Sequence, residues 1–367
     1  APPPPARGSS IKAPTTAESD PWFEAKEVVA EVMIDSIGKT LAAAEQHLEK
    51  SEWHEAEELY REVLQIAPRH YVALHGLGLV ARRTGRLEMA IRSLCRSLAS
   101  IPQVAIHRFN YAGALAEAGR YEEAAAEYLK TLEFDPSLTL ARVELGRVLQ
   151  KQGNHEEALA QFNRAGHHVA ADPNLLVYRG VSLASQCQLE AAIECFEQAL
   201  RLEPGHLPAL GAMADVYLED QQYEDAERCL RRALVMKPDV ATWHAQLGRV
   251  LQLAGRSEEA IPCLREAHRL APEEARFVVE LGSLYRDLCA CAEAEACLEK
   301  GLATQPQNIE LLNLLGLVLI DLGRFDDALR RFDEALRVCP DSATTRFNRS
   351  LALLHKVELR DGWKEYE

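Results

Sequence analysis

The chain has 367 residues, of which 47% are apolar and 26% are charged, as in ordinary folded proteins. Its formal net charge of −15 repels phosphate backbones, so general nucleic-acid binding is not expected. The longest nearly apolar run, residues 311–320, contains Asn313 and Gly316 and has about half the length that crosses a bilayer, so no membrane insertion is expected.

The chain begins with APPPPARGSS, which has no apolar stretch like that of a secretory signal. The first residue is not Met, which indicates a processed or engineered start. Residues 1–19 are rich in Pro, Ser and Thr and predict a disordered leader. The nine cysteines are an odd number and fall mostly within expected helices, which indicates a reduced protein in the cytoplasm.

A first helix is expected over residues 20–36. Asp20 and Pro21 fit an N-cap followed by proline at the first helical position. We expect this helix to cap the open end of the following array, with an apolar face made of Trp22, Phe23, Val28, Val29 and Val32.

From there the sequence repeats every 34 residues. Alanine occupies each such position from Ala56 to Ala328, and proline follows twelve residues later from Pro68 to Pro340, with Ala170 as the exception. Glycine or alanine lies twelve residues before each of these alanines, and a large apolar residue lies four after it. Four series in one register identify an internal repeat.

Each repeat predicts a pair of amphipathic helices. In residues 241–274, apolar side chains recur twice at helical spacing. Gly255 separates the two stripes and suits a helix C-terminus, and Pro272 ends the second helix. The small residues Gly248 and Ala260 allow the two helix axes to approach closely.

Stacking such pairs buries both stripes and predicts an all-α fold, an α-α superhelical solenoid of 34-residue repeats. The nine complete repeats cover 37–70, 71–104, 105–138, 139–172, 173–206, 207–240, 241–274, 275–308 and 309–342. Residues 343–367 form a partial tenth repeat without a polar capping helix. We therefore expect that the natural protein continues past Glu367 or that this end packs on a partner.

The sequence contains no Walker A, G-x-G-x-x-G, H-E-x-x-H or G-x-S-x-G motif, so we expect no enzyme activity, catalytic residue or cofactor. Acidic pairs such as Glu122–Glu123 open the second helices and are explained by the helix dipole. Four cysteines share one repeat position and are interpreted as packing residues: Cys195, Cys229, Cys263 and Cys297. Cys289 and Cys291 lack a second zinc-binding pair, and His167–His168 lacks further ligands, so no metal site is predicted.

The four series resemble the tetratricopeptide repeat family over residues 37–342. In that family the first helix of each repeat lines a concave groove that binds a protein or peptide. By repeat register, the resemblance implies these binding residues: His75, Arg82, Arg83, Phe109, Arg147, Lys151, Arg249 and Arg286.

Residues 69–108 hold seven arginines and a single acid, Glu88, in an otherwise acidic chain. A basic patch suited to an acidic peptide or terminal carboxylate would comprise Arg82, Arg83, Arg147 and Lys151. The alternative is that these arginines pair with acids of adjacent repeats, such as Glu45, Glu49 and Glu117.

Two subfamily patterns do not match. The Lys and Asn positions of the clamp in chaperone-binding members hold Leu41 and Glu45, and the asparagine ladder of O-linked N-acetylglucosamine transferases is reduced to Asn110 and Asn348. Residues 346–367 are similar to the last repeat of bacterial proteins that continue into a glycosyltransferase-type domain, through Gly362, Trp363, Tyr366 and Glu367.

Three functions follow from these patterns. The first is a scaffold or adaptor that binds a peptide or protein segment in the groove. The second is the substrate-recognition arm of a larger, glycosyltransferase-like enzyme of bacterial source. The third is a structural protein that self-assembles into a homo-oligomer through uncapped terminal repeats.

Overall fold

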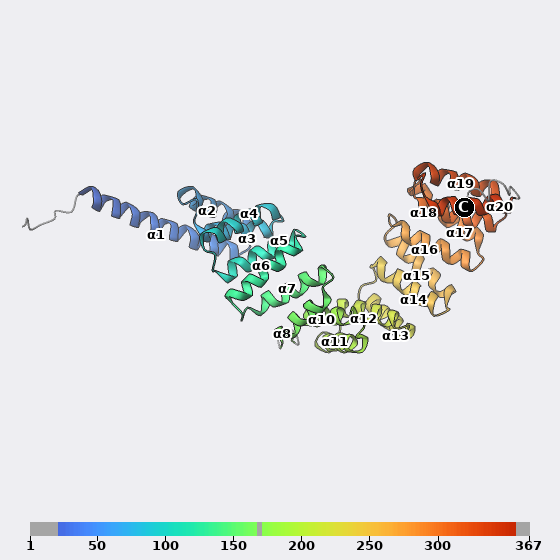
Figure 1. Ribbon diagram of the computed structural model, residues 1–367, viewed down its shortest axis with the longest axis horizontal. Coiled ribbons are helices and arrows are strands. Elements are labelled where there is room, and N and C mark those ends of the chain that lie inside the picture. The colour runs from blue at the N-terminus through green and yellow to red at the C-terminus, as the bar shows by residue number, and fades with distance from the viewer. Residues whose placement is uncertain (1–20, 167–170, 357–367) are drawn as a thin grey trace, which may run out of the picture. The chain divides into compact units, whose positions relative to one another are not determined.

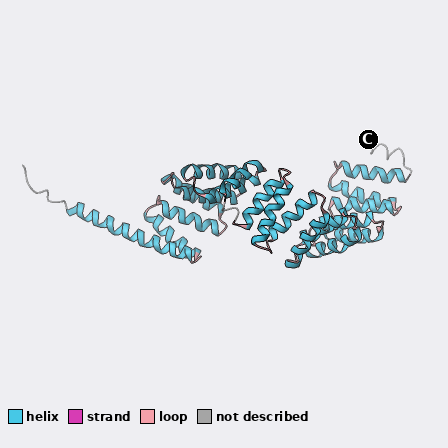
Figure 2. Cartoon of the chain, turned by 90° about the horizontal axis from the view of Figure 1, so that it is seen from below, coloured by secondary structure: helices cyan, strands magenta, loops and turns pink. Residues whose placement is uncertain are grey.

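The computed structural model describes residues 21–166 and 171–356, and this part of the chain is entirely helical, with nineteen helices (Figures 1 and 2). Their bounds are α1 Pro21–Glu49, α2 Trp53–Ile66, α3 Tyr71–Arg83, α4 Leu87–Ser100, α5 Ala105–Glu117, α6 Tyr121–Phe134, α7 Thr139–Lys151, α8 His155–Ala165, α10 Pro173–Ala184, α11 Leu189–Leu202, α12 Leu207–Glu219, α13 Tyr223–Met236, α14 Ala241–Leu253, α15 Ser257–Leu270, α16 Ala275–Asp287, α17 Cys291–Thr304, α18 Ile309–Asp321, α19 Phe325–Val338 and α20 Ala343–His355.

The chain divides into two compact parts, Ala1–Asn154 with α1–α7 and His155–Glu367 with α8–α20. Within each part a helix packs against its neighbours in sequence, as α14 does against α13 and α15, and against the helix two places on, as α16 does against α18. Contacts are therefore local along the chain, as in a solenoid. The expected all-α repeat architecture is confirmed.

The small residue of each repeat lies against the large residue of the same repeat. A Cβ atom added to Gly180 would lie 2.4 Å from Cε1 of Phe196 on the paired helix, and one on Gly248 would lie 2.9 Å from Cγ of Leu264. The marker alanine between them, such as Ala192, is fully buried. Because the ring or leucine occupies the Cβ space, the series of small and large residues repeat together.

The turn inside each repeat uses a left-handed residue at one fixed position. Five glycines there have φ between 74° and 79°: Gly85, Gly119, Gly153, Gly255 and Gly323. Four other residues adopt the same conformation with φ between 58° and 61°: Ser51, Cys187, Gln221 and Cys289. The turn geometry is thus kept even where the residue has a side chain, because the packed helices on either side determine it.

The N-terminal end differs from the expected separate cap over residues 20–36. A single helix, α1, runs through that boundary to Glu49. No proline interrupts it, and Ile37 and Leu41 pack on the core beneath α2 and α3, which keeps the chain helical past Gly38. The predicted leader, residues 1–19, lies outside the described residues.

No helix in the described ranges is long and apolar enough to cross a membrane. The shared cysteine position supports packing, since Cys195 and Cys229 are buried, and burial raises the pKa of the thiols at all four repeats. A raised pKa keeps these thiols protonated and unreactive. The described residues hold no group of three or more potential metal ligands, and His167–His168 lies outside them.

Candidate binding site in the N-terminal part

A pocket of about 580 Å³ lies in the N-terminal part where α1, α2, α3 and α5 meet. We call it the Trp53 pocket, and it is lined by Leu48, Glu49, Trp53, Leu79, Arg82, Arg83, Asn110 and Glu117. Leu48 and Trp53 are half-buried and pack on the core of the first repeat pair. The pocket therefore combines an apolar floor with a charged rim.

Arg82 is held within the wall of this pocket. Its Nε and Nη2 atoms donate to Oε1 of Glu117 over 3.0 and 2.7 Å. The guanidinium also lies over Gly113, where an added Cβ would come within 2.8 Å of Cζ. The alternative interpretation, pairing with an acid of the adjacent repeat, describes Arg82, so its charge is already balanced.

Arg83 is different. It is exposed at the rim of the pocket, and within the described parts of the chain no hydrogen bond or ion pair holds its guanidinium. Glu49 is exposed on the opposite element, α1. A ligand in this pocket would meet an exposed positive charge from α3 without first breaking a hydrogen bond or ion pair of that side chain.

His75 lies behind the pocket rather than in its lining. Its Nε2 atom is 2.9 Å from Nδ2 of Asn110, and its ring stacks on that of His107 with centroids 3.8 Å apart and planes 5° apart. Burial, and secondly the neighbouring His107, lower the pKa of His75 to about 4. Phe109 faces the core, with its ring tilted against buried Tyr128.

The predicted four-residue basic patch is not one cluster around the pocket. Arg147 on α7 donates from Nη1 to both oxygens of Glu144, over 2.9 and 3.0 Å. Lys151 is exposed at the end of α7. Neither residue lines the Trp53 pocket, where Arg82 and Arg83 do.

The two remaining predicted residues belong to the C-terminal part. Arg249 is exposed on α14. Burial raises the pKa of Glu280, although the positive charges of Arg276 and Arg249 act in the opposite direction. Nε of Arg286 lies 2.5 Å from Oδ2 of Asp321 on the next first helix. This pair occupies the same repeat positions as Arg82 and Glu117, so it too is a bond between repeats.

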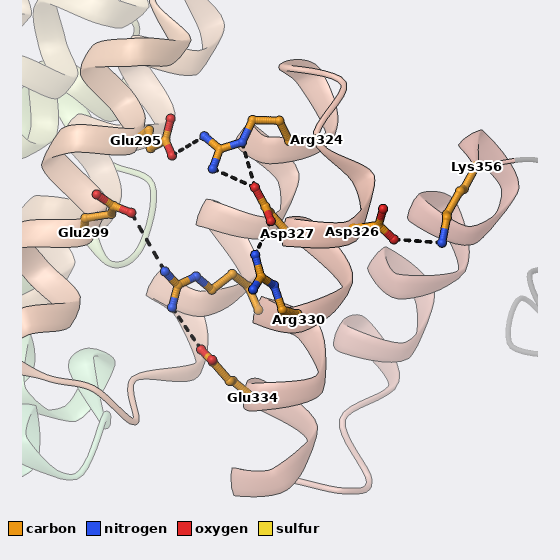
Figure 3. Close-up of polar contacts among 9 residues, drawn as sticks. Glu295, Glu299, Arg324, Asp326, Asp327, Arg330, Glu334 and Lys356 are labelled. Atoms are coloured by element: carbon orange, nitrogen blue, oxygen red, sulfur yellow. Dashed lines mark hydrogen bonds and ion pairs between the residues drawn. The ribbon is translucent and has the colours of Figure 1, made fainter.

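A second series of arginines bonds neighbouring repeats through their second helices. Nη1 of Arg324 lies 2.6 Å from Oε1 of Glu295, and Nε of the same side chain lies 2.8 Å from Asp327 (Figure 3). Lys356, directly after α20, adds a contact of 2.7 Å to Asp326 (Figure 3). These charges stabilise the stack and are already engaged with protein groups.

Sequence reasoning missed Trp53 and Leu48 as site residues. Trp53 begins the second helix of its repeat, a position where other repeats hold residues as different as Leu87, His155 and Ser257. A tryptophan at such a variable position is the signal that was available. Asn110, noted only as a remnant of a ladder, lines the pocket.

Family models described as Tetratricopeptide repeat match residues 41–103, 96–138, 143–206, 246–309 and 313–361, and a further one matches 183–249. No curated protein matched the sequence. The glycosyltransferase-type ending at residues 362–367 lies outside the described residues.

Solved structures are similar in fold. A tetratricopeptide repeat protein from Parabacteroides merdae has a TM-score of 0.55 and 18% identity, over 68% of this chain and 98% of its own. MamA has a TM-score of 0.43 and 22% identity, over 47% and 93%. YrrB, described as a TPR protein with an unusual peptide-binding site, has a TM-score of 0.43 and 21% identity, over 54% and 98%. Because the family models cover most of its length, this chain belongs to the tetratricopeptide repeat family.

Proposed function

We propose that this chain is a protein-interaction scaffold whose Trp53 pocket binds a short peptide segment carrying a carboxylate beside a large apolar side chain. Membership of the tetratricopeptide repeat family supports a scaffold function. The observation that carries the finer proposal is Arg83, an exposed guanidinium in the lining of a pocket that also offers apolar side chains.

The chemistry of the lining matches such a ligand. Trp53, Leu48 and Leu79 offer an apolar surface, and the volume of about 580 Å³ lies within the range of pockets that bind small ligands. A guanidinium binds a carboxylate through two parallel hydrogen bonds, which gives direction as well as affinity. Asn110 adds an amide that can bond to the peptide main chain.

The ion pair of Arg82 with Glu117 favours peptide binding and does not compete with it. Glu117 accepts two hydrogen bonds from Arg82, so the wall between α3 and α5 is fixed before a ligand arrives. A fixed wall reduces the conformational entropy lost on binding. Arg83 on the same helix can then bind the incoming carboxylate, because Glu117 is occupied.

A displayed library of peptides with free C-termini or internal acidic residues, screened against the full chain, would supply the ligand. With a selected peptide, Arg83→Gln should weaken binding by about tenfold or more, since a charge-assisted hydrogen bond contributes about 1.5–3 kcal/mol. Fluorescence polarisation measures the dissociation constant.

The matched control is Arg69→Gln, because Arg69 is an exposed arginine of the same arginine-rich stretch that does not line the pocket. It should bind the peptide as the unmutated chain does. Equal affinity of the Arg83→Gln and unmutated chains would show that the pocket does not bind the carboxylate.

A further inference from the structure

Each of the stacked histidines behind the Trp53 pocket has one ring nitrogen with a defined hydrogen-bond role. The Nδ2 atom of Asn110 can only donate, so Nε2 of His75 accepts and must carry no proton. The Ser97 hydroxyl donates to the carbonyl oxygen of Tyr71 over 2.9 Å and accepts from Nδ1 of His107 over 3.0 Å. His75 is therefore neutral in the observed arrangement, and His107 carries a proton on Nδ1, while burial lowers its pKa.

This pair joins two repeats at the back of the pocket wall. His75 lies on α3, whereas His107 and Asn110 lie on α5, and α3 and α5 are in direct contact. Ser97 is fully buried, His107 is 8% exposed and His75 is partly buried, so water solvates a charge added to the stack only in part. Asn110 connects the pair to the pocket, because it bonds to His75 and also lines the pocket.

Adding a proton to His75 would break this arrangement in two ways. Nε2 would become a donor facing the donor Nδ2 of Asn110, so the present hydrogen bond between α3 and α5 would break and the Asn110 amide would have to turn. A positive charge would also lie in a partly buried stack, 3.8 Å from the imidazole of His107, whose own pKa is lowered by burial.

The surrounding helices offer no compensating acid at the stack. The titratable and charged groups of these helices include Glu45 on α1, Tyr60 on α2, His70 at the N-cap of α3, Tyr71, Arg82 and Arg83 on α3, Glu88 and Cys95 on α4, and Arg108, Tyr111 and Glu117 on α5. Glu117 is bonded to Arg82, and among the described residues no carboxylate bonds to either imidazole of the stack. Tyr60 has a pKa raised to about 12 and stays neutral.

We propose that the His75–His107 stack is a proton switch that loosens α3 against α5 beside the Arg82–Glu117 pair, and so opens the wall of the Trp53 pocket, when the pH falls. The regulation of peptide binding rests on the proposed function, whereas the opening itself does not. Neutral pH keeps the wall closed and the pocket competent, and acid pH releases Asn110 from His75.

The direction and size of the effect follow from linkage. The closed wall holds His75 with a pKa of about 4, below its ordinary value of 6.5, so the open form binds more protons between these values. The stability of the closed form relative to the open form is therefore constant above pH 6.5 and decreases as the pH falls towards 4. At pH 5.5 this shifts the balance between the two forms by up to about tenfold.

Trp53 reports the opening without any ligand. In the full chain with Trp22→Phe, Trp243→Phe and Trp363→Phe, acrylamide quenching of Trp53 should increase between pH 7.5 and pH 5.5. His75→Gln keeps an acceptor for Asn110 but cannot titrate, so the quenching of Trp53 in this variant should not change with pH. In His107→Gln the increase of quenching at low pH should be reduced. An equal increase in His75→Gln, or no increase in the parent, would overturn the switch.

A second measurement avoids substitution of the stack. In NMR titrations of the full chain, the ring resonances of His75 should titrate well below pH 6.5, and the indole resonance of Trp53 should move with the same midpoint. A midpoint of His75 near 6.5 would contradict the proposal.

Peptide binding then tests the coupling. Affinity for the selected peptide should fall from pH 7.5 to pH 5.5 in the unmutated chain, by less than tenfold because the closed form predominates at pH 7.5, and the ratio of the two affinities should approach one in His75→Gln. If quenching responds to pH but no peptide binds, the proposed function fails and the switch stands. If a peptide binds with the same pH ratio in both chains, the switch fails and the proposed function stands.

Discussion

At the scale of single residues, the clearest feature is the turn inside each repeat, where one position needs a left-handed backbone. Glycine adopts this conformation without steric strain, whereas a residue with a Cβ is strained by roughly 1–2 kcal/mol. Gln221 and Cys289 nevertheless adopt it, with φ of 59° and 58°. The stacked helices on either side must therefore outweigh the local strain.

A substitution at this turn should stabilise the protein. We expect Gln221→Gly to raise the free energy of unfolding by about 1 kcal/mol, since relief of strain exceeds the extra freedom of glycine in the unfolded chain. Urea unfolding followed by circular dichroism measures the change. The reverse substitution at the equivalent position, Gly255→Gln, should lower stability, and a gain there would contradict the explanation.

The element scale concerns the bonds between successive second helices. Arg86 at the start of α4 donates to both oxygens of Glu57 on α2, with Nη1 2.9 Å from Oε1. The same pairing recurs as Arg256 with Glu227 and Arg324 with Glu295. Glu57 is only 5% exposed, and its hydrogen bond to Arg86 is the main cause of a lowered pKa. Of the three carboxylates, Glu57 is therefore the one whose charge depends most on its arginine partner.

Removing the partner should expose that dependence. Arg86→Ala should destabilise the chain by about 1–3 kcal/mol, because Glu57 would keep only the half-exposed Arg61 as a partner. The pKa of Glu57 is lowered on folding, so the contribution of the pair is present above pH 4.5 and is lost as the pH falls below it. Unfolding midpoints at pH 7 and pH 4 measure both effects.

The more exposed pair serves as the control for this prediction. Arg324→Ala should produce the smaller shift at pH 7, since both Arg324 and its partner Glu295 reach solvent. Equal shifts for the two substitutions would show that burial of the carboxylate does not set the strength of these bonds.

At the scale of the whole molecule, stability is carried by contacts between neighbouring repeats. In the C-terminal part α14 contacts α13 and α15, and α15 contacts α16, and the main contacts among the described helices join helices no more than two places apart. A solenoid of this kind unfolds locally, because each repeat depends only on the repeats beside it. Damage to one repeat should then spread over short distances.

An overpacked repeat tests this expectation. A side chain at Gly248 would enter the space of Leu264, so Gly248→Val should destabilise its repeat by roughly 1–3 kcal/mol. Hydrogen exchange should accelerate in α14, α15 and their neighbours, but little in α20. Uniform acceleration from α10 to α20 would show instead that this part unfolds as one cooperative unit.

The sequence by itself determined the fold, because the repeated small, alanine, large and proline positions each meet a constraint that every repeat shares. Gly180 and Phe196 illustrate this, since each is explained by the space left by the other. It did not determine where α1 begins to pack, because no residue marks an end at position 36, and helix propensity carries the chain through.

The tertiary structure alone decided the site. Arg82 and Arg83 are adjacent in sequence and equivalent in charge, yet one is bonded to Glu117 across 35 residues and the other is exposed at a pocket rim. Trp53 and Asn110 come to the same pocket from different repeats, and His75 meets His107 behind it. Repeat register shows which helix carries a side chain, but its partner depends on the residues of the next repeat, which vary.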